Sequence, residues 1–198
     1  MNLESHLPAL QVVVPLLSVP IVMLLKPRGF AWAATTAASA VALAIAISMT
    51  SAVLSGAEIR YLMGSWAAPY GIELRVDAFS AVLLLVITGA STLALAAGPR
   101  SITDQIEVER QPMFYAAWLL AVAGLAGIAI SADAFNIFVF MEISSLASYV
   151  LIAGGPDRRA LPAVFKYLIM GTIGATFYLI GVGLIYMMTG TLNLADME

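Results

Sequence analysis

The stretch Asn136-Ile-Phe-Val-Phe-Met-Glu142-Ile-Ser-Ser-Leu-Ala-Ser-Tyr149 lies within an apolar run, residues 135–153, and places one carboxylate near its middle. The run has the length of a membrane-spanning helix, which needs about 20 mostly apolar residues. An ionisable side chain at the centre of a bilayer is costly unless water, a counter-charge or a neighbouring helix receives it. Glu142 therefore predicts ion or proton traffic at this helix, and an acid that only locks helix packing is the alternative.

The composition indicates an integral membrane protein. Of the 198 residues, 62% are hydrophobic and 11% are charged, whereas about 25% of the residues in a soluble domain are charged. The net charge of −3 gives no sign of nucleic-acid binding. Cysteine is absent and His6 is the single histidine, so ligands for iron–sulfur clusters, thiolate zinc sites and b-type haem are missing. We expect no cofactor, no metal site and no bond-breaking catalytic centre in this chain.

Six apolar segments are long enough to cross a bilayer: residues 7–25, 30–54, 78–97, 113–131, 135–153 and 161–188. Lysine and arginine in short loops mark the cytoplasmic side of a membrane. One side of these spans carries six such residues, and the other carries two: Lys26, Arg28, Arg100, Arg110, Arg158 and Arg159 against Arg60 and Arg75. The count predicts a single multi-pass domain with both termini on the outside. We expect no cleaved signal peptide, because an acid precedes the first apolar run and the positive charges follow it.

The long outer loop, residues 55–77, predicts a short β-hairpin. Residues 72–77, Ile-Glu-Leu-Arg-Val-Asp, alternate between apolar and charged side chains, the pattern of a strand that faces two environments. Residues 58–61 alternate in the same way, and Gly64 and Gly71 between the two segments favour a turn. An irregular loop is the alternative.

Glu142 heads a polar stripe, because Ser145 and Tyr149 follow it at i+3 and i+7 on the same helix face. Lys166, inside the sixth span, is the candidate counter-charge. It either points inward and pairs with Glu142, directly or through water, or extends its ammonium group to the cytoplasmic interface. Tyr167 beside it is a further candidate for the polar path.

Other polar and small residues have simpler interpretations. Asp77 and Asp133 precede the third and fifth spans, where we expect each to be a helix N-cap. The charged residues 104–110 are expected to form a solvated cytoplasmic loop. A stripe of small residues in the sixth span predicts close packing against another helix: Gly171, Gly174, Ala175 and Gly181.

Four segments together carry a family resemblance: residues 136–149, residues 163–171, residues 66–80 and residues 189–196. They resemble the proton-conducting antiporter-like subunits of respiratory complex I, membrane-bound hydrogenases and Mrp-type cation/proton antiporters. The chain looks most like the N-terminal portion of the D subunit of an Mrp-type Na⁺/H⁺ antiporter. Members of the family usually contain two inverted helix repeats, and the second repeat is missing from this sequence.

The resemblance implies an all-α integral membrane fold with about six transmembrane helices and an outer β-hairpin, part of an antiporter-like subunit. It implies a bacterial plasma-membrane protein that assembles with other hydrophobic subunits and moves protons and Na⁺. Glu142 and Lys166 would belong to a hydrated charged axis across the membrane. Two alternatives stay open: a proton-pumping membrane-arm subunit of a complex I-like NADH:quinone oxidoreductase or hydrogenase, and a structural subunit without its own conduction path.

Overall fold

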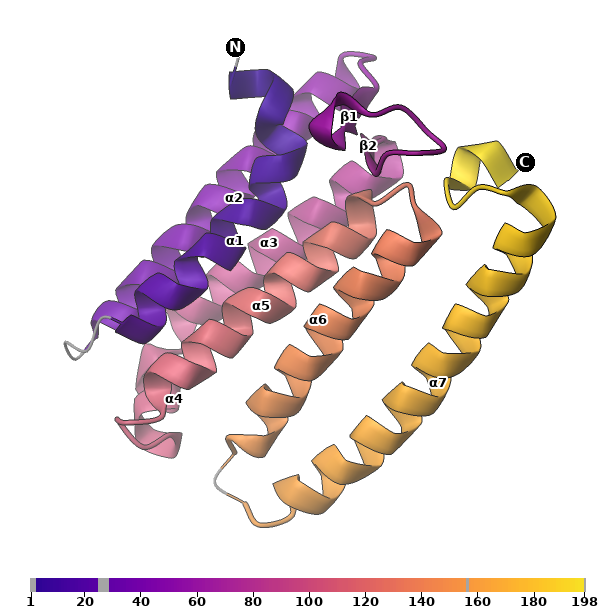
Figure 1. Cartoon of the computed structure of the whole chain (residues 1–198). Helices are drawn as coiled ribbons and strands as arrows, with labels where there is room; N and C mark the ends of the chain where they lie inside the picture. Colours follow the sequence, from indigo (N-terminus) through magenta and orange to yellow (C-terminus); the bar gives the residue numbers. More distant parts are fainter. Residues whose placement is uncertain (1–2, 25–28, 156, 198) are drawn as a thin grey trace.

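The computed structural model describes residues 3–24, 29–155 and 157–197 (Figure 1). Six helices are long and apolar enough to cross a membrane. They are α1 (Leu7–Leu24), α2 (Phe30–Leu54), α3 (Ala78–Ala97), α5 (Gln111–Ile130), α6 (Ala134–Ala153) and α7 (Ala160–Thr189). These helices begin and end within two residues of the ranges expected from the sequence. Leu25, Lys26 and Arg28, which also entered the sequence predictions, lie outside the described residues.

The hairpin expected between the second and third spans is present. Strands β1 (Ile59–Leu62) and β2 (Glu73–Val76) pair antiparallel, with Ile59 opposite Val76. Short 3₁₀ turns lie before α1, inside the hairpin and after α7 (Leu3–His6, Met63–Ser65 and Leu194–Met197). The hairpin and the end of α7 lie at the same end of the bundle, which we call the outer end (Figure 1).

The charged segment 104–110 is expected from its sequence to be a loop, but its first two residues belong to a short helix. Helix α4 (Pro99–Gln105) follows α3 directly and starts with a proline, a residue well suited to the first helical position. The charge of this segment obscured the helix, because a helix of seven residues is too short to show a clear apolar period. Beyond it, Arg110 and Glu107 form an exposed ion pair at 3.1 Å.

Both predicted N-caps are confirmed. The side-chain oxygen of Asp77 accepts a hydrogen bond from the Ser80 amide at 2.8 Å, and Asp133 accepts one from the Asn136 amide at 2.7 Å. Each aspartate satisfies a backbone donor that the first turn of a helix leaves free. The start of α6, the helix that carries Glu142, is therefore fixed by its own sequence.

The hydrophobic core lies between α1, α2, α3 and α5. Helix α6 packs on α5, and α7 packs on α6 (Figure 1). One buried cluster lies toward the outer end, beneath the hairpin, and includes Met49, Leu84 and Ile130. A second cluster, which includes Leu95 and Leu119, lies toward the opposite or inner end. Burial decreases across the last helices. In the apolar 18-residue stretch of each helix, 56% is buried in α5, 17% in α6 and 6% in α7.

The outer end is joined by backbone hydrogen bonds that extend the hairpin sideways. The Ala132 amide donates to the Glu73 carbonyl oxygen at 3.0 Å, and the Leu194 amide donates to the Ala132 carbonyl oxygen at 2.9 Å. The side chain of Asn193 donates to the carboxylate of Glu73 at 3.0 Å. The expectation that β2 faces two environments is wrong at Glu73, which is only 7% exposed, because the segment before α6 and the segment after α7 cover it.

Candidate ion-translocation site

Helix α6 is positioned by two glycines of α5. A Cβ atom at Gly124 would lie 2.7 Å from the Ser144 Cβ, and one at Gly127 would collide with the ring of Phe140. The two glycines therefore let the helices approach closely. Sequence reasoning missed this contact, although the Gly-x-x-Gly spacing in α5 is a signal that could have revealed it.

This contact sets the direction of Glu142. Phe140 and Ser144 of α6 both touch α5. Glu142 lies two residues from each of them, about 200° around a helix of 3.6 residues per turn. Its side chain therefore leaves α6 on the face opposite α5.

Glu142 lies near the middle of its span. It is about 12 Å along the helix axis from Ala134 and about 17 Å from Ala153, at 1.5 Å per residue. The side chain is half-buried. Among the residues that the structure describes, no group forms a hydrogen bond or an ion pair with its carboxylate.

Helix α7 touches α6 through two pairs of aromatic rings. Near the inner end, Tyr149 and Tyr167 meet edge to face with ring centroids 5.0 Å apart. Near the outer end, Phe138 and Tyr178 stack with centroids 6.2 Å apart. The Tyr178 hydroxyl also donates to the Ala134 carbonyl oxygen at 3.0 Å. Two of the predicted polar-path residues, Tyr149 and Tyr167, are thus brought into contact.

The two ring pairs imply one antiparallel register between α6 and α7. In this register Gly174 lies opposite Glu142, and Lys166 lies opposite Val150. Lys166 is exposed and is displaced from Glu142 by eight residues, about 12 Å along the helix axis. Within the described part of the chain the two charges form no ion pair within 4.0 Å, so only water or intervening groups could connect them.

The small-residue stripe of α7 packs at two of its four positions. At Gly171 an added Cβ would meet the Tyr149 hydroxyl, and Ala175 is buried. Gly174 and Gly181 have no heavy atom of another described element within 4 Å of an added Cβ. Within the described residues, no helix packs on these two positions, so the prediction of close packing stays open there. At the level of Glu142, Gly174 places no side chain between α7 and α6.

Comparisons with known proteins place the sequence and the fold of this chain in a known family. Residues 131–198, which contain α6 and α7, match the family described as NADH:quinone oxidoreductase/Mrp antiporter, TM. The chain is 42% identical to the NADH-quinone oxidoreductase N subunit of Desulforudis audaxviator, with 98% of this chain and 39% of the relative covered. It is 32% identical to the Na(+)/H(+) antiporter D subunit of Bacillus subtilis, with 96% and 38% covered.

Two solved structures superpose on nearly the whole chain. One is an archaeal membrane-bound sulfane sulfur reductase, with a TM-score of 0.90, 34% identity, and 97% of this chain and 39% of that chain covered. The other is the Mrp complex from Dietzia sp., with a TM-score of 0.87, 29% identity, and 99% and 36% covered. The chain is thus a multi-pass membrane chain with the fold of these complexes' subunits.

These matches confirm the resemblance drawn from the sequence motifs. The chain corresponds to the N-terminal portion of the antiporter-like subunits that NADH:quinone oxidoreductases and Mrp antiporters share. It spans about two fifths of the length of the curated relatives that it matches, 39% and 38% for the two described above.

Proposed function

We propose that the chain is an ion-translocating membrane subunit of a multi-subunit antiporter that exchanges a monovalent cation, Na⁺, for protons. The observation that carries the proposal is Glu142: a carboxylate near the middle of a membrane-spanning helix, aimed away from α5, with no hydrogen bond or ion pair from the described residues. An acid kept at this depth without a partner is costly. Its use as a proton acceptor and donor explains why it is there.

The path on the inner side runs along the interface of α6 and α7. Ser145 and Tyr149 continue the polar face below Glu142, and Tyr149 touches Tyr167. Lys166 lies next to Tyr167 on α7, toward the inner end. Water between these hydroxyl groups would connect Lys166 with Glu142 over the separation of about 12 Å along the helix axis. The space beside Gly174 is open, so a water chain is not blocked by a side chain there.

A second function is favoured by the relatives themselves. One of them is named as a subunit of an NADH-quinone oxidoreductase, and one superposed structure is a sulfane sulfur reductase complex. In that case the chain would pump protons in a membrane arm driven by redox chemistry in other subunits. The chain's own part would still be proton transfer at Glu142, because it has no cysteine and one histidine with which to hold a redox centre.

Charge-neutral substitution tests the proposal in the assembled complex. Everted membrane vesicles containing the complex are loaded with a pH-sensitive dye, and Na⁺-dependent and redox-dependent proton movement are recorded in parallel. Glu142→Gln is expected to abolish proton movement while the complex is recovered in normal amount. Lys166→Gln is expected to slow it. Glu109→Gln, an exposed acid between α4 and α5, is the matched control and is expected to change nothing.

The two driving forces separate the two functions. Proton movement on addition of Na⁺ alone supports the antiporter, whereas movement that requires an electron donor supports the redox-driven arm. Full transport by the Glu142→Gln complex would contradict both and leave the chain a structural role.

A further inference from the structure

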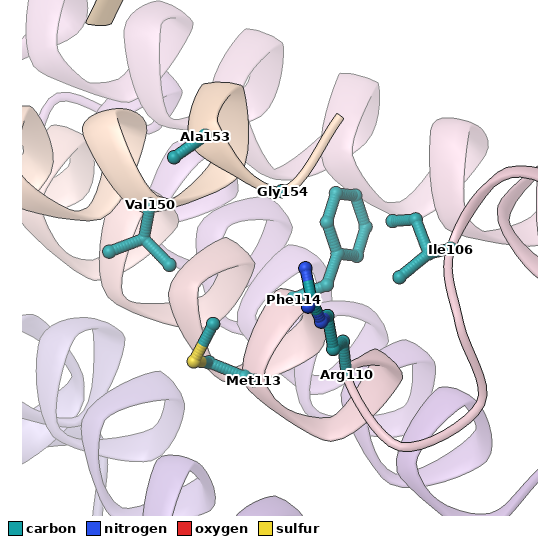
Figure 2. A pocket seen from close by; sticks show the side chains of 7 residues that line it. All are labelled: Ile106, Arg110, Met113, Phe114, Val150, Ala153 and Gly154. Carbon is teal, nitrogen blue, oxygen red and sulfur yellow. The ribbon is translucent and has the colours of Figure 1, made fainter. Parts of the chain in front are cut away.

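A pocket lies at the inner end of the bundle, between the start of α5 and the end of α6 (Figure 2). It has a volume of about 260 Å³, and its walls include Ile106, Phe114, Val150 and Ala153. Among the described residues that line it, only Arg110 is charged, and its guanidinium lies beside Phe114 (Figure 2). An apolar hollow with a single cation at its mouth has the polarity of a lipid site.

An apolar groove between α1, α5 and α6 adjoins the pocket. This groove has a volume of about 420 Å³ and shares Met113 and Val150 with the pocket at the rim. Its further walls include Met23, Leu120 and Leu146. Met23, Met113 and Leu146 are 48–55% exposed, so the groove opens onto the outer surface of the bundle, where an acyl chain can enter from the side.

Together, the pocket and the groove extend along the bundle for about half the thickness of a bilayer. From Arg110 to Leu120 the axis of α5 advances about 15 Å, and the hydrocarbon core of a bilayer is about 30 Å thick. The groove therefore follows one leaflet from the membrane surface toward the midplane. Arg110 lies just before α5, at the level of the lipid headgroups, on the side that the lysine and arginine count predicts to be cytoplasmic.

The charge at the mouth selects the headgroup. Arginine binds phosphate oxygens with two parallel hydrogen bonds, and basic pockets between transmembrane helices on the cytoplasmic side bind anionic lipid headgroups. Arg110 at present pairs with Glu107 at 3.1 Å, and the two side chains are 65% and 75% exposed. Exposed ion pairs of this kind are weak, so a lipid phosphate can replace the Glu107 carboxylate.

We propose that this groove binds an anionic phospholipid, with one acyl chain between α1, α5 and α6 and the phosphate on Arg110. An apolar helix of another subunit is a poorer occupant, because it would offer no phosphate to the guanidinium and would leave Arg110 with only its weak, exposed pair to Glu107. The site is separate from Glu142, which leaves α6 on the face opposite α5, so the proposal does not depend on the transport function.

Photo-crosslinking of the assembled complex tests the proposal. The complex is reconstituted in phosphatidylcholine vesicles that contain a trace of phosphatidylglycerol with a diazirine near the end of one acyl chain. After illumination, adducts are located by mass spectrometry of peptides. Because an acyl chain anchored at Arg110 ends near the midplane, we expect adducts on the deep groove walls, at Leu120 or Leu146. We also expect competition by unlabelled phosphatidylglycerol but not by added phosphatidylcholine.

Matched variants separate the site from general surface charge. Arg110→Gln is expected to lower the adduct yield about fivefold, the effect of one basic residue near an anionic membrane surface. Arg100→Gln, which removes a charge from α4 at the same end, is expected to leave the yield unchanged, and Glu107→Gln is expected to maintain or raise it. Leu146→Trp fills the groove and is expected to lower the yield for any lipid.

Three results would overturn the proposal. They are adducts outside the groove, equal competition by the two lipids, and equal losses of yield in Arg110→Gln and Arg100→Gln. Groove walls that receive no adduct in the intact complex would also overturn it, because another protein segment would then occupy the groove.

Discussion

The two faces of α6 differ sharply. The face toward α5 is tightly packed, because glycines of α5 leave room for Phe140 and Ser144. In α5 itself, 56% of the apolar 18-residue stretch is buried. On the side of α7, whose own apolar stretch is only 6% buried, α6 meets its neighbour at two ring pairs with open space beside Gly174 between them. Glu142 leaves the helix away from the tightly packed face. Rigidity on one side and access on the other would suit the proposed role of Glu142 as a proton carrier.

The largest effect is expected from a substitution in the tightly packed interface of α5 and α6. Gly127→Leu puts side-chain carbons into the ring of Phe140 and is expected to destabilise the chain by about 3 kcal/mol, the upper end for overpacking of a core. Gly183→Leu in α7 meets open space and is expected to stabilise the chain slightly, by up to about 1 kcal/mol of helix propensity. The free energy of unfolding in mixed detergent micelles measures both, and equal effects would mean that the faces do not differ.

The outer end of α7 provides a second contrast, because there the loosely packed helix is tied to the hairpin. Asn193→Ala removes the hydrogen bond to the buried Glu73 carboxylate, whose other partner is Arg60 at 3.9 Å. Leaving a buried acceptor short of a partner costs about 1–3 kcal/mol. Gln105→Ala on exposed α4 is the control. Proteolysis of the segment after α7 is expected to accelerate in Asn193→Ala only, and an unchanged rate would show that the tie contributes little.

The N-cap of α3 tests how much a single side-chain hydrogen bond stabilises a helix at the membrane surface. Asp77→Ala is expected to cost about 1 kcal/mol. The hydrogen bond from the Ser80 amide holds the pKa of Asp77 below its ordinary value of 3.8, against the opposing effect of burial. A lowered pKa in the folded state means that the stabilisation is complete above the unfolded-state pKa and disappears as the pH falls through the folded-state pKa.

Unfolding measured at several pH values checks this assignment. The stability difference between wild type and Asp77→Ala is expected to be constant at neutral pH and to vanish in acid. Asp104→Ala, at an exposed position of α4, serves as the control. A difference that persists below the folded-state pKa would show that the cap does not act through its charged form.

The smallest effect is expected where α7 touches α6 near the inner end. Gly171→Ala gains about 1 kcal/mol of helix propensity but meets the Tyr149 hydroxyl, so its net effect on stability is expected to be near zero. Tyr149→Phe removes that hydroxyl. The double variant is therefore expected to be more stable than the sum of the single changes, a coupling that a double-mutant cycle measures. Strict additivity would place the two helices further apart.

Much of the fold is encoded locally. Apolar runs define six spans, alternation at residues 58–61 and 72–77 indicates the hairpin, and Asp77 and Asp133 mark helix starts through a single side-chain hydrogen bond each. The burial of Glu73 could not be predicted in this way. It depends on segments before α6 and after α7 that reach β2 only once the chain has folded.

The candidate site divides in the same manner. The depth of Glu142 in its helix follows from counting residues, and its position among apolar neighbours makes it conspicuous. The distance from Lys166 does not follow from either sequence pattern, because it depends on the register between two helices, set here by Tyr149 with Tyr167 and by Phe138 with Tyr178. A span tells how deep a residue lies, whereas the register tells what lies opposite it.

The most direct measurement is infrared difference spectroscopy of the reconstituted complex while the pH is stepped across its working range. A carboxylic C=O stretch reports protonated glutamate, and Glu142→Gln identifies which residue contributes it. We predict a carboxylic band that gains and loses intensity with the proton load in wild type and is absent from Glu142→Gln. An identical band in both proteins, or none in wild type, would contradict the assignment of Glu142 as the group that carries the proton.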